Sequence, residues 1–228
     1  MKVIRDIALT FNNDEFKLYL DFHLYKSNFL FQSRFIGNYL RRQLKSLNFE
    51  PKGYKRLLIN LCQLDCPPNK MGVYYPSDLC VYVPFDRSMY DDLRNDELAD
   101  FYIDLYLNGV QKAQGTHILP EKFIIEKLAE FKANGYKNEW EFKSKTFKEI
   151  SIKATLFCQL TMNAFILSLI LSKKKEVVFS KEILNTLPDE ICYHYQFKDI
   201  ILENNKIIVT GWYDAPPIYE LDLSFKAE

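Results

Sequence analysis

The 228-residue chain is poor in glycine, with only seven residues and no two of them spaced as a phosphate-binding loop requires. Folds that hold nucleotide phosphates use glycines at fixed positions in tight turns, in both the dinucleotide fingerprint and the phosphate loop. The sequence therefore argues against the common kinds of nucleotide-dependent chemistry, and we expect no cofactor.

Histidine is scarce too: the complete set is His23, His117 and His194. Cys192 and His194 stand two residues apart in a segment, 190–197, that we expect to be a strand, so nothing would orient the base. The chain lacks a Gly-x-Ser-x-Gly nucleophile elbow. Cys62 and Cys66 have no second Cys or His pair at zinc-ligand spacing. We assign no catalytic residue and no metal ligand, and we do not expect an enzyme.

The five cysteines are an odd number without the tight spacing of a disulfide framework. Arg5 and Asp6 place charges where a signal peptide would have its apolar core. We therefore expect a cytoplasmic protein with reduced thiols. The most apolar stretch, residues 155–175, carries Gln159 and Asn163 in its first half. This pattern predicts a buried hairpin and no membrane span, which would need about 20 mostly apolar residues.

Charge is balanced overall, with 30 basic and 30 acidic residues, but it is distributed unevenly. Residues 1–57 have a net charge of +6 and residues 77–110 a net charge of −6. Residues 137–184 have +4 and residues 185–228 have −5. A surface that is neutral overall but charged locally can attract partners of either sign.

Strands and helices are both recognisable in the first half of the chain. Alternation of apolar and polar residues predicts a strand over 16–25, and apolar residues at helical spacing predict a helix near 31–47. Short apolar runs predict strands over 55–63, 72–76 and 79–85.

Two helices are expected in the middle, the first over about 88–112. The second begins at Pro120 and ends at Asn134-Gly135, and its predicted buried stripe is Ile124, Ile125, Leu128 and Phe131. From residue 139 onward the pattern predicts strands, with Asn204-Asn205 as the tight turn of a hairpin. We expect an α+β fold with a largely antiparallel sheet and segregated helices. We expect one domain over 1–228, with sub-lobes 1–136 (mixed α/β) and 137–228 (β-rich).

The segment DDLRNDELADFYIDLY, residues 91–106, is the most acidic in the chain. On a helix, residues four apart share one broad face, so the row Asp92, Asp96, Asp100 and Asp104 would be displayed together. Like charges at this spacing repel and cost helix stability. A purely structural surface would interleave lysines with the aspartates, which makes this row a candidate contact for a basic partner.

Two other interpretations of the acidic row remain open: a solvated helix face and a metal site. Asp91-Asp92 followed by Asp96 resembles the aspartate-rich helices that bind Mg²⁺-diphosphate in isoprenoid synthases. Those enzymes are all-helical and carry a second carboxylate cluster, which this strand-rich sequence lacks. Mg²⁺ also prefers one or two carboxylates together with substrate phosphate.

The first helix carries the opposite charge, because Arg34, Arg41 and Lys45 share a face with Asn38. Such a face can bind phosphates, but no aromatic residues are interleaved with the basic ones. We therefore expect no nucleic-acid partner. The face would be solvated or would complement the acidic helix within the molecule.

The C-terminal third contains FKSKTFKEI and then LPDEICYHYQFKDIILENNKIIVTGWYD. From about Phe142 to Leu223 it resembles proteins of bacterial toxin–immunity loci, in which a small cytoplasmic protein protects its producer from a polymorphic or contact-dependent toxin. The resemblance rests on the general sequence pattern and not on an invariant motif, and it assigns a function to no individual residue. It implies a stoichiometric protein inhibitor without chemistry of its own.

Our first hypothesis is therefore an immunity-type protein that occludes a cognate toxin, such as a basic nuclease, through Asp92, Asp96, Asp100 and Asp104. The alternatives are a metal-assisted hydrolase and a structural subunit of a larger assembly. The hydrolase would use carboxylates of residues 91–104 together with His117 or His23.

Overall fold

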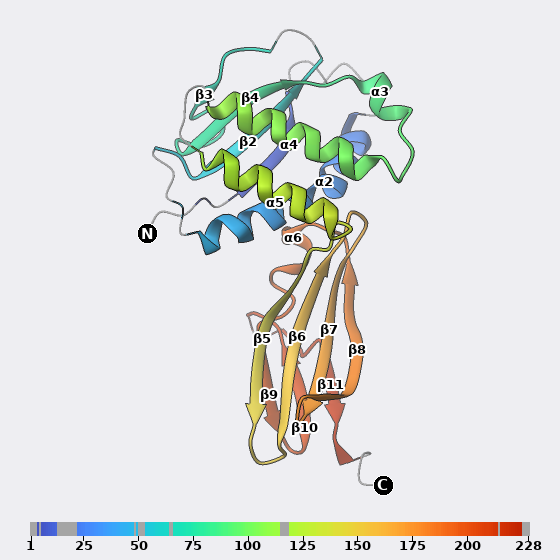
Figure 1. The fold of residues 1–228 in the computed structure, drawn as a ribbon. Coiled ribbons are helices and arrows are strands. Elements are labelled where there is room, and N and C mark those ends of the chain that lie inside the picture. The colour runs from blue at the N-terminus through green and yellow to red at the C-terminus, as the bar shows by residue number, and fades with distance from the viewer. Residues whose placement is uncertain are drawn as a thin grey trace. The chain divides into compact units, whose positions relative to one another are not determined.

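The computed structural model describes residue 4, residue 49 and residues 6–12, 22–47, 53–63, 66–114, 119–213 and 215–224. The chain divides into two compact units, Met1–Tyr136 and Lys137–Glu228. The long helices lie in the first unit, and antiparallel sheets make up most of the second (Figure 1). The predicted α+β fold class is confirmed.

The first unit is built on a sheet with the strand order β1-β2-β4-β3. Its three longer strands run parallel, and the two-residue β3 pairs antiparallel with β4 at the edge. The strands are β1 (Asp6–Phe11), β2 (Arg56–Cys62), β3 (Lys70–Met71) and β4 (Asp78–Pro84). Strands buried on both faces read as continuous apolar runs, which explains why β2 and β4 were recognisable in the sequence.

Two helices cover one face of this sheet, and a third packs against them. The helix α2 (Phe22–Ser46) packs on β1, α4 (Leu98–Gln114) packs on β4 and β2, and α5 (Glu121–Ala133) packs against both helices. Figure 1 shows α4 and α5 side by side. Two helical glycines allow close approach: a Cβ on Gly37 would lie 2.3 Å from the Ile7 carbonyl oxygen, and one on Gly109 would lie 2.4 Å from Ile59 Cδ1.

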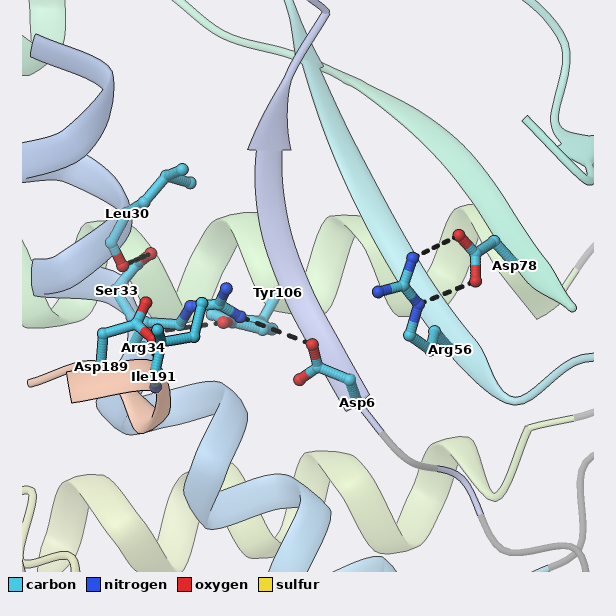
Figure 2. A network of polar contacts seen from close by, with 9 residues as sticks. All are labelled: Asp6, Leu30, Ser33, Arg34, Arg56, Asp78, Tyr106, Asp189 and Ile191. Carbon is cyan, nitrogen blue, oxygen red and sulfur yellow. Dashed lines mark hydrogen bonds and ion pairs between the residues drawn. The ribbon is translucent and has the colours of Figure 1, made fainter. Parts of the chain in front are cut away.

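The opposite face of the sheet combines a small apolar cluster with polar pairs. Its buried cluster, against which Cys66 packs, consists of Ala8, Leu58, Cys62, Cys80 and Tyr82. The Tyr74 hydroxyl donates to Asn60 Oδ1 at 3.2 Å. Both oxygens of the fully buried Asp78 carboxylate accept from the Arg56 guanidinium, at 2.8 and 2.5 Å (Figure 2). The segment after β2 therefore covers this face.

The second unit contains two antiparallel sheets, ordered β5-β6-β7-β8 and β11-β10-β9. The first sheet consists of β5 (Glu139–Phe147), β6 (Ile152–Leu160), β7 (Phe165–Lys173) and β8 (Glu176–Thr186). The second consists of β9 (Asp199–Glu203), β10 (Lys206–Thr210) and β11 (Tyr219–Asp222). Alternate residues of β6 and β7 are buried, so the predicted hairpin within 155–175 is confirmed.

Aromatic stacking and one ion-pair cluster hold the second unit together. The Phe165 ring stacks on Tyr193 at 3.7 Å and on Phe197 at 5.7 Å between centroids. Lys143 and Lys145 both approach Asp199 Oδ1, at 3.0 and 2.9 Å. Burial raises the pKa of Asp199, but the bonds from the two lysines and from the Ile200 amide outweigh it and bring the pKa to about 2.

The predicted turn at Asn204-Asn205 is confirmed, since both residues have positive φ, 49° and 60°, between β9 and β10. These angles are those of a type I′ turn, whose twist matches that of the strands it joins.

Three predicted strands need correction, beginning with residues 16–25. Residues 22–25 belong to α2, and 16–21 lie outside the described residues. Tyr25 and Phe29, one helical turn apart, both pack against Phe11, at 6.0 and 4.8 Å between ring centroids. This contact favours the helix over the alternating pattern.

The predicted strands at 72–76 and 190–197 are wrong as well. Residues 72–75 form bends and residue 76 begins a turn; Gly72 has a φ of 72°. Residues Glu190–Tyr193 form the short helix α6, where the Asp189 carboxylate caps the Ile191 amide at 2.9 Å. Among the described residues, no helix is long and apolar enough to cross a membrane.

Candidate functional site: an acidic surface around α3 and α4

The acidic segment does not form one helix. The predicted helix over 88–112 is instead two: α3 (Arg87–Asp91) and α4, separated by a turn over 92–97. Asp and Asn side chains compete with the backbone for hydrogen bonds and disfavour helix interiors, and the turn is rich in both. Repulsion between aspartates four residues apart adds to this effect.

The start of α3 is fixed by the side chain of Asp86. Its carboxylate accepts hydrogen bonds from the Ser88 and Met89 amides, at 2.9 and 3.2 Å, and from Ser88 Oγ at 2.7 Å. These bonds lower the pKa of Asp86 below its ordinary value, with the Ser88 hydroxyl as the largest cause. The cap therefore keeps its negative charge at neutral pH.

A polar network beneath the turn holds α3 against α4. The Tyr90 and Tyr102 hydroxyls lie 2.8 Å apart, and both donate to Gln32 Oε1, at 3.2 and 2.9 Å. The Tyr90 ring packs against Phe29 at 5.1 Å and against Phe101 at 5.5 Å. Residues from α2, α3 and α4 thus converge under the acidic segment and fix its position.

The four predicted contact residues lie in different structural settings. Asp92 is the C-cap of α3, and Asp96 lies in the turn that follows. Only Asp100 and Asp104 share a helix, on α4. The prediction of one continuous row on a helix face is therefore wrong.

The carboxylate of Asp100 forms its contacts largely within the molecule. Its carboxylate accepts from the Tyr136 hydroxyl at 2.6 Å and pairs with Lys132 Nζ at 2.8 Å. Both bonds lower the pKa of Asp100 below its ordinary value, and the bond from Lys132 has the larger effect. Burial and the bond to Asp100 raise the pKa of Tyr136 to about 12. Asp100 thus joins α4 to the end of α5.

The remaining carboxylates face outward. Asp96 and Glu97 both pair with Arg94, at 3.4 and 3.1 Å, in a mostly exposed cluster. Asp92 and Asp104 are exposed, and neither forms an ion pair within the part of the chain that the structure describes. Residues 86–104 contain seven acidic and two basic side chains, a net charge of −5. We call the outward-facing carboxylates the acidic surface: Asp86, Asp91, Asp92, Asp96, Glu97 and Asp104.

One end of the acidic surface borders an open cleft of about 750 Å³. The cleft lies where β2 and β4 end, and its lining comprises Cys62, Gln63, Pro84, Phe85, Asp86, Arg87, Ser88, Met89 and Asp91. The Arg87 guanidinium lies over the Tyr25 ring at 4.3 Å and pairs with Asp91 Oδ2 at 3.4 Å. Asp86 and this cleft were not predicted, although an aspartate directly after a strand is a typical helix cap.

The other candidate residues lie apart from this site. His23 is exposed and lies on the helix α2, whereas the sequence pattern predicted that it would lie on a strand. His117 lies outside the described residues. Cys192 lies in α6, whereas His194 caps its end and stacks near Trp212 at 6.4 Å. None of the five cysteines, all of which lie in the described part of the chain, forms a disulfide bond. Among the described residues, no group of three or more His, Cys, Asp or Glu side chains is arranged to hold a metal ion.

The basic face expected on the first helix is partly internal. Arg34 pairs with Asp6 of β1 at 3.5 Å (Figure 2), and Asn38 is buried. The predicted stripe of α5 is correct at Ile124, Leu128 and Phe131, but Ile125 is 40% exposed.

Comparison of the chain with known protein families, with curated proteins and with solved structures finds no match.

Proposed function

We propose that this protein is an immunity-type inhibitor: it binds a cognate bacterial toxin in the cytoplasm and neutralises it by occlusion, without catalysis. The acidic surface is its contact, and the partner carries a complementary basic patch, as nucleases do. The observation that carries this proposal is a dense set of outward-facing carboxylates held on a rigid support.

Charge is the first argument. The segment 86–104 concentrates a net charge of −5 in a chain whose overall charge is zero. A local field of this kind accelerates encounter with an oppositely charged partner and rejects partners of the same sign. A group of outward-facing carboxylates also presents closely spaced negative charges, as does the phosphate backbone that a nuclease site binds.

Rigidity is the second argument. Binding costs less when the contact groups are already in place, because fewer side chains and loops have to be ordered. The Gln32–Tyr90–Tyr102 network and the aromatic rings around it fix α3 relative to α4. The Asp86 cap fixes the start of α3. The carboxylates are thus presented from a packed base.

The cleft supplies an anchor point beside the charged surface. Its walls combine the apolar side chains of Phe85 and Met89 with the carboxylates of Asp86 and Asp91. This combination suits a lysine or arginine, which has an apolar stem and a charged head. Arginine anchors in pockets are common centres of binding energy. Insertion of such a residue would compete with Arg87 for Asp91.

Co-expression tests the proposal. The C-terminal domain of the protein encoded directly upstream of this chain would be expressed from an inducible promoter, with and without this chain, and growth would be followed. We expect growth to stop with the domain alone and to continue when both are present, and the two proteins to co-purify. Toxicity unchanged by co-expression, or rescue without a complex, would overturn the proposal.

A further inference from the structure

The second unit carries an open pocket of about 420 Å³ at one end of its four-stranded sheet. Its lining residues are Thr146, Ser151, Lys153, Ser172, Lys174 and Lys175. Each of them carries a hydrogen-bond donor, three as ammonium groups and three as hydroxyls. Among the described residues, no carboxylate belongs to the lining.

Strand register builds the floor of this pocket. Thr146 of β5 pairs with Lys153 of β6, which in turn pairs with Ser172 of β7. Residues directly opposite one another on neighbouring strands point to the same face, so these three form a row across the sheet. Ser172 Oγ donates to the Lys153 carbonyl at 3.5 Å, and Lys153 Nζ pairs with Glu141 at 3.3 Å.

The rim is formed by two turns in unusual conformations. Ser151 has a φ of 54°, and the consecutive residues Lys174 and Lys175 have φ values of 48° and 74°. Such angles are disfavoured for residues other than glycine and asparagine, and a two-residue hairpin turn of this type prefers Asn-Gly. A Lys-Lys turn therefore serves the hairpin poorly, and strain of this kind often marks a functional position.

We propose that this pocket is an anion site that binds a phosphate monoester. A phosphate monoester presents a compact dianion whose oxygens accept many hydrogen bonds, which matches the three ammonium groups and the hydroxyls of Thr146 and Ser151. The Ser172 hydroxyl already donates to the Lys153 carbonyl. The pocket is larger than a bare phosphate, so it leaves room for part of the esterified group. Lys153 would exchange its pairing with Glu141 for the ligand. The site lies in the second unit and does not depend on the proposed inhibitor function.

Two sources of this group can be separated by experiment. The full chain, labelled with ¹⁵N, would be titrated with glycerol 3-phosphate at constant ionic strength and followed by heteronuclear NMR. In a second arm, it would be sedimented with phosphatidylcholine vesicles with and without phosphatidic acid. We expect saturable shifts at the amides of Ser151, Lys174 and Lys175 in the first arm, and co-sedimentation dependent on phosphatidic acid if a lipid headgroup is the source.

The test variant is Lys174→Asn with Lys175→Gly, which removes two charges and installs the preferred turn. We expect it to bind at least tenfold more weakly and to be at least as stable as the wild type. The matched control is Lys181→Gln with Lys206→Gln, which removes two charges elsewhere in the same unit; its affinity should change less than twofold. No saturable binding in either arm, or an equal loss in the control, would overturn the proposal.

Discussion

Asp100 and Asp104 lie four residues apart on α4 and look equivalent in the sequence, but the structure gives them different roles. Replacing each separately by alanine separates these roles. The change in intrinsic helix propensity is nearly the same at both positions, so it cancels in the comparison. What remains is the loss of the bonds from Lys132 and Tyr136 to Asp100, together with the loss of a favourable interaction with the helix dipole, because Asp100 but not Asp104 lies in the first turn of α4.

The expected difference follows from the geometry of those bonds. A hydrogen bond to a charged group contributes about 1.5–3 kcal/mol when buried, and an exposed ion pair about 0.2–1 kcal/mol. The Asp100 side chain is 43% exposed, so screening places the sum nearer the lower values. We expect Asp100→Ala to lower the free energy of unfolding by about 1–2 kcal/mol. Asp104→Ala should change it by less than about 0.5 kcal/mol.

Urea unfolding of the two variants measures this difference. The coupling is checked by repeating Asp100→Ala in a chain that carries Lys132→Met and Tyr136→Phe, where it should cost less than about 0.5 kcal/mol. The stabilisation by Asp100 in the wild type should also decrease in acid. Folding lowers the pKa of Asp100, so the stabilisation is present above the ordinary pKa of an aspartate and is lost as pH falls through the pKa of Asp100 in the folded state. Equal destabilisation by Asp100→Ala and Asp104→Ala would refute the distinction.

Three further outcomes are expected. Gly37→Ala should lower the free energy of unfolding by more than about 2 kcal/mol, although alanine favours helices by about 1 kcal/mol, because the new Cβ would meet the backbone carbonyl of Ile7, which cannot move aside. Gly109→Ala should also destabilise the fold, but less when Ile59→Ala removes the side chain that the new Cβ would meet. Urea unfolding of the single and double variants measures both effects. The wild type should lose the stabilisation from Asp199 as pH falls from about 4 to about 2, the window set by the lowered pKa of Asp199, and Asp199→Asn should lack this pH-dependent stabilisation. Acid unfolding followed by circular dichroism compares the two proteins. Asn205→Gly should leave thermal stability unchanged or raised, whereas Asn205→Val should lower the unfolding free energy by about 1 kcal/mol or more.

The elements that sequence analysis predicted well are those whose pattern is set locally. The α5 boundaries follow from Pro120 and from Asn134-Gly135, and the hairpin after Glu203 follows from its turn residues. The parallel strands β2 and β4 were recognisable because strands buried on both faces are continuously apolar. Their parallel pairing was not predicted, since it depends on partners distant in the sequence.

The errors arose where tertiary contacts compete with a local pattern. The alternation over 16–25 favours a strand, yet Tyr25 and Phe29 need helical spacing to reach Phe11. In the acidic segment, the interval of four residues favours one helix, but Tyr90 and Tyr102 must both reach Gln32, which a break after Asp92 permits. The pairing of Asp100 with Lys132 and Tyr136 likewise depends on how α5 packs, and no spacing rule reveals it.

The central claim is that the acidic surface binds a basic partner, and the association rate constant tests it most directly. Stopped-flow mixing with the purified domain encoded upstream would compare the wild type with Asp92→Lys/Asp104→Lys, which reverses two exposed carboxylates that form no ion pair among the described residues. The matched control is Glu176→Lys/Glu203→Lys, with the same charge change on exposed residues of the second unit. Steering predicts that the first variant associates at least tenfold more slowly at low salt, that salt reduces the difference, and that the control changes less than twofold. Equal rate constants for the wild type and both variants would contradict the claim.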